Sequence, residues 1–222
     1  MQNYLKRMWK LSIGLILYSF GLLFNIHANI GLAPWEAFSI GIYNVTGISF
    51  GKVSVITGIL ILIAVALYFR EKIGVGTILN TIFIGLLVDL WEILNIIPYM
   101  NTFASGLVML FLGQVLVSLA TYFYVSAGLG SGPRDTLMIA LGKKFSNVPI
   151  GVIRGLIEGT VLLIGWILGA KVGLGTVVYV FGISFILQTT FNLLNFDVKS
   201  VEHESIFDTI NALKELYAKS EA

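Results

Sequence analysis

The chain contains two similar segments, NIGLAPWE at residues 29–36 and GLGSGPRD at residues 128–135. Their prolines, Pro34 and Pro133, lie 99 residues apart (133 − 34), and each is followed two residues later by a carboxylate. Proline is favoured in the first turn of a helix. Each segment therefore predicts a turn that leads into a helix, and the pair predicts an internal repeat.

A second pair of motifs supports the repeat. The turn GVGT at residues 74–77 matches GLGT at residues 173–176, again 99 residues later (173 − 74). Gly51 and Gly151 each open a long apolar run and lie 100 residues apart, which indicates a one-residue insertion. The chain therefore divides into a first repeat, a second repeat and a tail, which we place at residues 1–100, 101–196 and 197–222.

The composition requires a membrane. Of 222 residues, 57% are hydrophobic and 12% are charged, and there is no cysteine. A soluble domain has about 25% charged residues. This excludes a soluble enzyme, a secreted disulfide scaffold and a disordered protein, and it leaves an integral membrane protein with the lipid bilayer as its first partner.

Six apolar stretches reach the length of about 20 residues that a membrane-crossing helix needs. They are residues 11–30, 51–69, 75–97, 104–125, 150–169 and 174–195. The first is longer than the apolar core of a cleaved signal peptide, so we expect it to remain as a span. The Pro-initiated stretches 34–46 and 133–145 are too short to cross and predict re-entrant or interfacial helices.

The predicted fold is therefore an all-α membrane protein of six transmembrane helices. Three crossings per repeat is an odd number, so the two repeats have opposite orientations, a plan typical of secondary transporters. If both short helices crossed, there would be eight spans and parallel repeats. That alternative would place Arg70 and Lys72 outside, against the tendency of basic residues to lie inside.

The basic residues also predict the orientation. Lys6, Arg7 and Lys10 precede the first span, and further Lys and Arg residues follow the even-numbered crossings that return to the same side. We expect both termini in the cytoplasm. Apolar residues at helical spacing within 197–222, such as Ile206 and Ile210, predict a cytoplasmic amphipathic helix that packs on the membrane domain or binds a partner protein.

These residues also resemble a known family. The GLAPWE segment, the GLGSGPRD segment and the pair Arg154 and Glu158 are similar to those of the YczE/YyaS family of bacterial membrane proteins, which is often grouped with YitT. The similarity covers residues 5–195 and leaves out the tail. It implies a small multi-pass protein of the bacterial inner membrane, and it carries over no substrate or site residue.

The two proline motifs form the predicted substrate site. A helix that starts inside the membrane directs its free N–H groups and its positive dipole end at that point. Pro34, Trp35 and Glu36 would meet Pro133, Arg134 and Asp135 near the midplane. An arginine fork suits a carboxylate or phosphate, and a tryptophan offers an aromatic face, so we expect an organic anion or a zwitterion. The alternative is that both carboxylates only stabilise their helix starts.

Further polar residues lie at membrane depth. Asp89 is a candidate for proton coupling, because a carboxylate near Glu92 and partly buried resists ionisation. Arg154 and Glu158 share one helix face and either line a cavity or form a structural pair. Asn29 and Gln114 either bind substrate or form hydrogen bonds between helices. For Glu92 the alternative is that it reaches the outer interface.

Glycines recur every fourth residue at Gly151, Gly155 and Gly159. Such steps let helices approach closely in lipid. We expect this face to pack inside the protein, with a homodimer contact as the alternative.

Several functions lack their motifs. There is no phosphate-binding GxxxxGK[ST] loop, no HExxH zinc motif and no GxSxG nucleophile turn. We therefore expect no enzyme, no metal, no cofactor and no nucleic-acid partner. The favoured hypothesis is a small secondary transporter of a small organic solute, with proton coupling. The alternatives are a substrate-binding or accessory membrane subunit that needs an energising or signalling partner, and a structural or enzymatic membrane protein.

Overall fold

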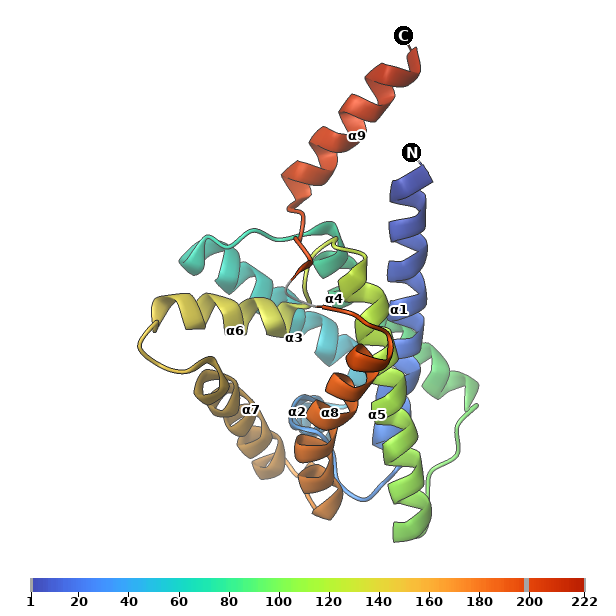
Figure 1. The fold of residues 1–222 in the computed structure, drawn as a ribbon. Helices are drawn as coiled ribbons and strands as arrows, with labels where there is room; N and C mark the ends of the chain where they lie inside the picture. Colours follow the sequence, from blue (N-terminus) through green and yellow to red (C-terminus); the bar gives the residue numbers. More distant parts are fainter. Residues whose placement is uncertain (1, 198–199, 222) are drawn as a thin grey trace.

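The computed structural model describes residues 2–197 and 200–221, and within them every regular element is a helix (Figure 1). Six of these helices are long and apolar enough to cross a membrane, which confirms the predicted all-α, six-span fold class. They are α1 (Gln2–His27), α3 (Phe50–Ala64) with its π-helical continuation η1 (Val65–Phe69), α4 (Val75–Leu94), α5 (Phe103–Ser126), α7 (Ile150–Ile167) and α8 (Leu174–Leu193).

The three remaining helices are short. The helices α2 (Pro34–Thr46) and α6 (Pro133–Lys144) each begin at the predicted proline, and an extended residue precedes each of them. The tail forms α9 (Ile206–Glu221). Residues 198–199 and 222 of the predicted tail, and the side chains of Leu213 and Tyr217, lie outside the described residues.

The centre of the fold is the antiparallel pair α1 and α5, which lie side by side in Figure 1. A Cβ atom at Gly14 would lie 2.8 Å from the backbone nitrogen of Tyr124. At the other end of the pair, a Cβ atom at Gly106 would lie 2.5 Å from the carbonyl oxygen of Ala28. The two backbones therefore touch along their length, which leaves room only for glycine at these positions.

The loops before α2 and α6 contact the Gly-x-Gly-Thr turns reciprocally. The backbone N–H of Gly175 donates to the carbonyl of Ile30 at 3.0 Å, and the N–H of Gly76 donates to the carbonyl of Leu129 at 2.7 Å. These are the same hydrogen bond made twice, because 129 − 30 and 175 − 76 both equal 99. Each half of the chain thus supplies the loop of one contact and the turn of the other.

The backbone conformations of the two loops repeat as well. Asn29 and Gly128, at φ 57° and 66°, are equivalent, as are Gly31 and Gly130, at φ 138° and 123°. A Cβ atom at Gly130 would lie 2.4 Å from the Thr77 hydroxyl. Glycine is needed there both for its conformation and for the close approach.

The glycine face of α7 corrects one prediction. Gly151, Gly155 and Gly159 are exposed, and a Cβ atom at any of them would meet nothing within 4 Å. The expectation that this face packs inside the protein is wrong, because α7 turns a different side to its neighbour. It packs on α2 at Gly165, where a Cβ atom would lie 2.4 Å from the carbonyl of Ala37.

The tail is attached where it begins. The Arg7 guanidinium lies 2.5 Å from the Glu204 carboxylate, and the Glu204 backbone N–H donates to the carbonyl of Gly128 at 2.9 Å. The N–H of Ile206 donates to the carbonyl of Ile73 at 2.9 Å. The following helix, α9, projects away from the bundle beyond the N-terminal end of α1 (Figure 1).

Candidate functional site

A pocket of about 220 Å³ lies where the N-terminal ends of α2 and α6 meet. All six residues of the predicted proline motifs line it, and helices α1, α3, α4, α5, α7 and α8 complete its wall. This volume is below the 300–1,000 Å³ of pockets that take drug-sized molecules. The pocket therefore has room for a small metabolite or a head group.

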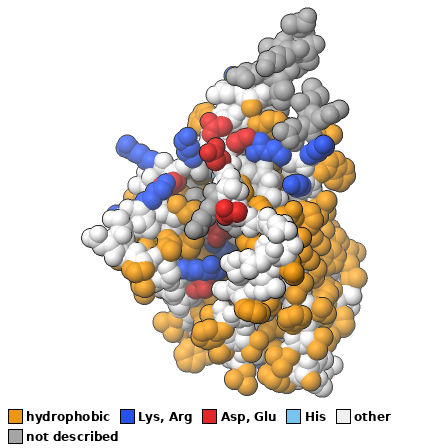
Figure 2. All heavy atoms as spheres, in the orientation of Figure 1, with side chains coloured by type: hydrophobic (Ala, Val, Ile, Leu, Met, Phe, Trp, Pro, Cys, Tyr) orange, Lys and Arg blue, Asp and Glu red, His pale blue; other side chains and the backbone are white. Residues whose placement is uncertain are grey.

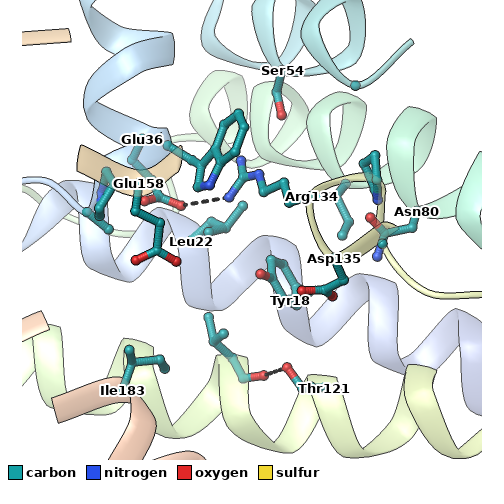
Figure 3. Close-up of a pocket in the computed structure, with 18 of the residues that line it drawn as sticks. Tyr18, Leu22, Glu36, Ser54, Asn80, Thr121, Arg134, Asp135, Glu158 and Ile183 are labelled. Carbon is teal, nitrogen blue, oxygen red and sulfur yellow. Dashed lines mark hydrogen bonds and ion pairs between the residues drawn. The ribbon is translucent and has the colours of Figure 1, made fainter. Parts of the chain in front are cut away.

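The polar contacts of the pocket start from Arg134, on the first turn of α6. Its guanidinium carbon lies 4.8 Å from the ring centroid of Trp35, and its Nη1 atom lies 3.7 Å from the Glu36 carboxylate (Figure 3). Glu36 is buried, with 2% of its surface exposed. The two proline motifs therefore meet through an arginine that stacks on a tryptophan and faces a buried carboxylate.

Asp135 occupies the other side of the pocket. The Tyr124 hydroxyl donates to its carboxylate at 3.3 Å, and the Tyr124 ring lies edge-on to Tyr18 with 6.1 Å between centroids. Figure 3 shows Tyr18 and Asp135 close together below Arg134. Aromatic rings with polar tips suit a site that must contact both charged and apolar groups.

The pair Arg154 and Glu158 lines the same pocket from α7. The Arg154 Nε atom donates to the Glu158 carboxylate at 2.8 Å, and their side chains are 51% and 26% exposed. If all five ionisable side chains from these helices are charged, two arginines and three carboxylates give a net charge of −1 (2 − 3). The pocket thus offers both signs of charge.

Asp89 lies outside this pocket. Its carboxylate accepts hydrogen bonds from the Ser49 hydroxyl at 2.5 Å and from the backbone N–H of Gly51 at 2.8 Å. Both donors belong to the start of α3, where free N–H groups need acceptors. The geometry thus gives Asp89 a role in joining α4 to the N-terminus of α3.

Gln114 and Asn29 also lie outside it. The Gln114 amide donates to the Tyr179 carbonyl at 3.2 Å and so joins α5 to α8. The Asn29 side chain donates to the carbonyl of Met100 at 3.1 Å, and it accepts a hydrogen bond from the Lys171 ammonium at 2.8 Å. Both residues thus make the interhelical or interloop contacts that were the alternative prediction.

Glu92 contacts a cluster at the other end of α4. The His27 ring nitrogens lie 2.7 Å from the Glu92 carboxylate and 2.7 Å from the Ile97 carbonyl, and the Tyr99 hydroxyl donates to Glu92 at 3.0 Å. Glu92 therefore reaches the loop that follows α4, as the alternative prediction had it. Within residues 2–197 and 200–221, no group of three or more His, Cys, Asp or Glu could hold a metal ion.

Sequence reasoning missed part of the pocket wall. Tyr18, Ser54, Asn80 and Tyr179 all line it. Tyr18 and Tyr179 are polar-tipped residues within long apolar spans, and this signal could have drawn attention to them. The others are small polar residues, which also occur in spans as packing residues.

Comparisons with known proteins agree with the resemblance predicted from the proline segments. Residues 5–192 match the family described as "Family of unknown function (DUF6198)". The chain is 33% identical over 190 residues to the uncharacterized membrane protein YczE of Bacillus subtilis, covering 83% of this chain and 87% of that relative. It is 28% identical over 170 residues to the uncharacterized protein YyaS of the same organism, covering 76% and 84%. It is 32% identical over 170 residues to an uncharacterized protein of Haemophilus influenzae, covering 75% of each. No solved structure matches the chain significantly.

Proposed function

This chain belongs to the DUF6198 family, and we propose that it is a small secondary transporter of a small organic zwitterion. The observation that carries the proposal is the pocket in which two half-helices from different halves of the chain, together with α7, bring together five ionisable side chains. Ionisable groups at membrane depth are costly and mark transport pathways in many membrane proteins. We assign the chain no enzymatic reaction.

The charges of the pocket favour a zwitterion over an anion. The Arg134 fork is 3.7 Å from Glu36, which is longer than a direct hydrogen bond, so its N–H groups remain available for a carboxylate or phosphate. Glu36 and Asp135 offer oxygens to an ammonium group. A net charge of −1 would repel an anion that carries no positive group.

The packing of the two halves supports alternating access. The equivalent helices α1 and α5 run antiparallel, and the loops and turns of the two halves contact each other reciprocally. Both features are expected if the halves are inverted repeats related by a two-fold axis in the membrane plane. Rocking of one such repeat against the other would expose the pocket to each side in turn.

We place the protein in the bacterial inner membrane with both termini in the cytoplasm. Figure 2 shows Lys and Arg side chains gathered toward the upper end of the molecule, where the N-terminus and α9 lie, and an apolar surface below. Arg7, close to the N-terminus, pairs with Glu204 at the start of the tail. This asymmetry follows the positive-inside rule.

Proton coupling, in this proposal, belongs to Glu36. Glu36 is buried in the pocket wall, whereas Asp89 is occupied by two donors at the start of α3. A carboxylate in the binding site can exchange a proton for the charged group of a solute. The variant Glu36→Gln should therefore remove the effect of a pH gradient on uptake.

The test is uptake by the purified protein in liposomes. A radiolabelled panel of small zwitterions, including amino acids and betaines, is compared with dicarboxylates and with simple amines. We expect a zwitterion to accumulate and dicarboxylates to be excluded. Arg134→Ala should raise the half-saturating solute concentration by about tenfold or more, because a hydrogen bond to a charged group contributes about 1.5–3 kcal/mol to binding.

Two matched variants control this experiment. Lys144→Ala removes a cation from the exposed end of α6, and Trp166→Ala removes a tryptophan that is 60% exposed on α7. Both should transport normally, whereas Arg134→Ala and Trp35→Ala should not. The proposal fails if the two pocket variants handle every solute as the wild type does.

One observation favours a second function. The helix α9 projects away from the bundle, and such a helix could bind an energising or signalling partner (Figure 1). In that case the chain is the substrate-binding subunit of a larger assembly. A truncated chain lacking residues 206–222 would then bind solute in liposomes with unchanged affinity but lose function in cells.

A further inference from the structure

The seam between α3 and α4 is closed. A Cβ atom at Gly51 would lie 2.0 Å from the carbonyl oxygen of Gly85, so the two backbones are in direct contact. Asp89 strengthens this contact by accepting the hydrogen bond from the Gly51 N–H. The α3 and α4 backbones therefore leave no gap between them at this point.

The equivalent seam in the second half of the chain is open. By the 99- and 100-residue offsets, Gly151 stands where Gly51 does and Ser184 stands where Gly85 does. A Cβ atom at Gly151 would meet nothing within 4 Å, and Ser184 is exposed while it lines the pocket. Within the described residues, α7 packs mainly on α2, and α8 packs mainly on α5. The helices α7 and α8 do not pack extensively along one another.

The opening carries charge at its edge. We define the lateral opening as the three pocket-lining residues that are also exposed on α7 and α8, which are Arg154, Val180 and Ser184. Figure 2 shows basic and acidic side chains in a recess on the face toward the viewer. A charged side chain exposed to hydrocarbon costs about 2.5–3.5 kcal/mol on insertion scales.

The surface around the lateral opening is apolar. Phe181 and Phe185 on α8 are 77% and 75% exposed, and Leu156 on α7 is 65% exposed. An apolar chain would find a compatible surface here, while a polar head at the opening would compensate the half-exposed pair of Arg154 and Glu158. A water-soluble solute would use only the charged opening and not the apolar surface around it.

We infer that the transported zwitterion is an amphiphile, which reaches the pocket from the bilayer through the lateral opening. Its ammonium group would face Glu36 and Asp135, its acidic group would lie between Arg134 and Arg154, and its apolar chain would remain between α7 and α8. The cavity of about 220 Å³ has room for the head alone. This inference rests on the proposed transport function and names the class of its substrate.

The experiment uses a photoactivatable probe in liposomes that contain the full chain. The probe is a lysophosphatidylethanolamine with a diazirine on its acyl chain, and mass spectrometry maps the labelled peptides. We expect labelling on α7 and α8, competed by unlabelled lysophosphatidylethanolamine but not by lysophosphatidylglycerol, whose head has no positive group. Ser184→Trp should reduce labelling about tenfold by filling the opening, while Val177→Trp, exposed on the same helix but outside the pocket, should not.

Several outcomes would overturn the inference. They are labelling spread evenly over all lipid-facing helices, labelling that Ser184→Trp leaves unchanged, and a change of oligomeric state in Ser184→Trp, since a second copy would then be what covers the opening. Arg154→Gln, which adds no bulk, repeats the test if Ser184→Trp fails to fold.

Uptake of a soluble zwitterion in the same liposomes separates this inference from the transport proposal. Specific labelling without transport of any solute would sustain the amphiphile site and refute transport. Transport of a soluble zwitterion that Ser184→Trp does not slow, with no specific labelling, would sustain transport and refute the lateral route.

Discussion

Replacing Asp89 distinguishes a structural role for this carboxylate from a role in proton coupling. In Asp89→Ala the Ser49 hydroxyl and the Gly51 N–H both lose their acceptor. Hydrogen bonds to a charged group contribute about 1.5–3 kcal/mol each. Two such bonds would contribute about 3–6 kcal/mol, whereas the loss of an ordinary helix cap costs ~0.5–2 kcal/mol. Because the site is only partly buried and water can replace the carboxylate, we expect the free energy of unfolding to fall by an intermediate amount, about 2–4 kcal/mol.

The assay is thermal unfolding of the detergent-purified protein, followed by tryptophan fluorescence at one scan rate. For a chain of this size, 1 kcal/mol corresponds to about 2–4 °C, so Asp89→Ala should lower Tm by roughly 4–16 °C. Asp89→Asn keeps an oxygen for the Gly51 N–H and should lower Tm by only about 2–4 °C, for ~1 kcal/mol. Gln188→Ala is the matched control, because Gln188 is the equivalent residue of the second half and, among the described residues, its side chain donates to Asn192 on its own helix.

The reasoning is refuted if Asp89→Ala leaves Tm unchanged, or if Asp89→Asn is as damaging as Asp89→Ala. A variant Asp89→Asn with normal Tm that has lost pH-driven uptake would return the coupling role to this residue.

Three further predictions concern single positions, the first two measured by the same unfolding assay. Gly130 has φ 123° and lies in close contact with the facing turn, so Gly130→Ala should lower the free energy of unfolding by about 2–5 kcal/mol. Gly47 has φ 71° with open space around it, so Gly47→Ala should lower it by only ~1–2 kcal/mol. Equal losses in the two variants would refute the close contact at Gly130. Gly165→Ala should lower Tm because its Cβ would strike α2, while Gly155→Ala should leave Tm unchanged or raise it by better helix propensity, and a reversed order would contradict the packing of α7. Hydrogen bonds from Ser205, which precedes α9, lower the pKa of the Asp208 carboxyl. The contribution of this carboxylate to the stability of the helix start is therefore present above the unfolded pKa of about 3.9 and is lost as the pH falls through the lower folded pKa. The protection factors of the amides in the first turn of α9, which correct for the intrinsic pH dependence of exchange, should then fall only below about pH 4, and a fall between pH 5 and 8 would refute this assignment.

The elements of the fold could be predicted because their signals are local. The length of each apolar run determines the spans, and Pro34 and Pro133 mark the starts of the short helices, which begin at those residues in the structure. The start of α1 at Gln2 was missed, because Lys and Arg residues outside the apolar run are good helix formers as well.

The side that each helix turns to its neighbours could not be predicted in the same way. Gly165, rather than Gly151 or Gly155, meets α2, and the spacing of glycines alone does not distinguish these choices. Asp89 was singled out for its burial, yet its partners come from a helix that begins some 40 residues earlier (89 − 49). The meeting of the two proline motifs was expected from the repeat, whereas the tyrosines beside them were not.

The reciprocal hydrogen bonds also constrain how the chain is made. The loop at Ile30 is closed by Gly175, so 145 residues (175 − 30) must be synthesised between the two partners. At about 5–20 residues per second, this interval lasts roughly 7–30 s. Asn25 on α1 lacks its cover only for the first part of this interval, because the helix against its side chain is α5, where a Cβ atom at Gly113 would lie 2.2 Å from the Asn25 Oδ1 atom. The earliest loop of the chain is therefore completed only near the end of translation, long after α5, the helix that packs on α1, has been synthesised.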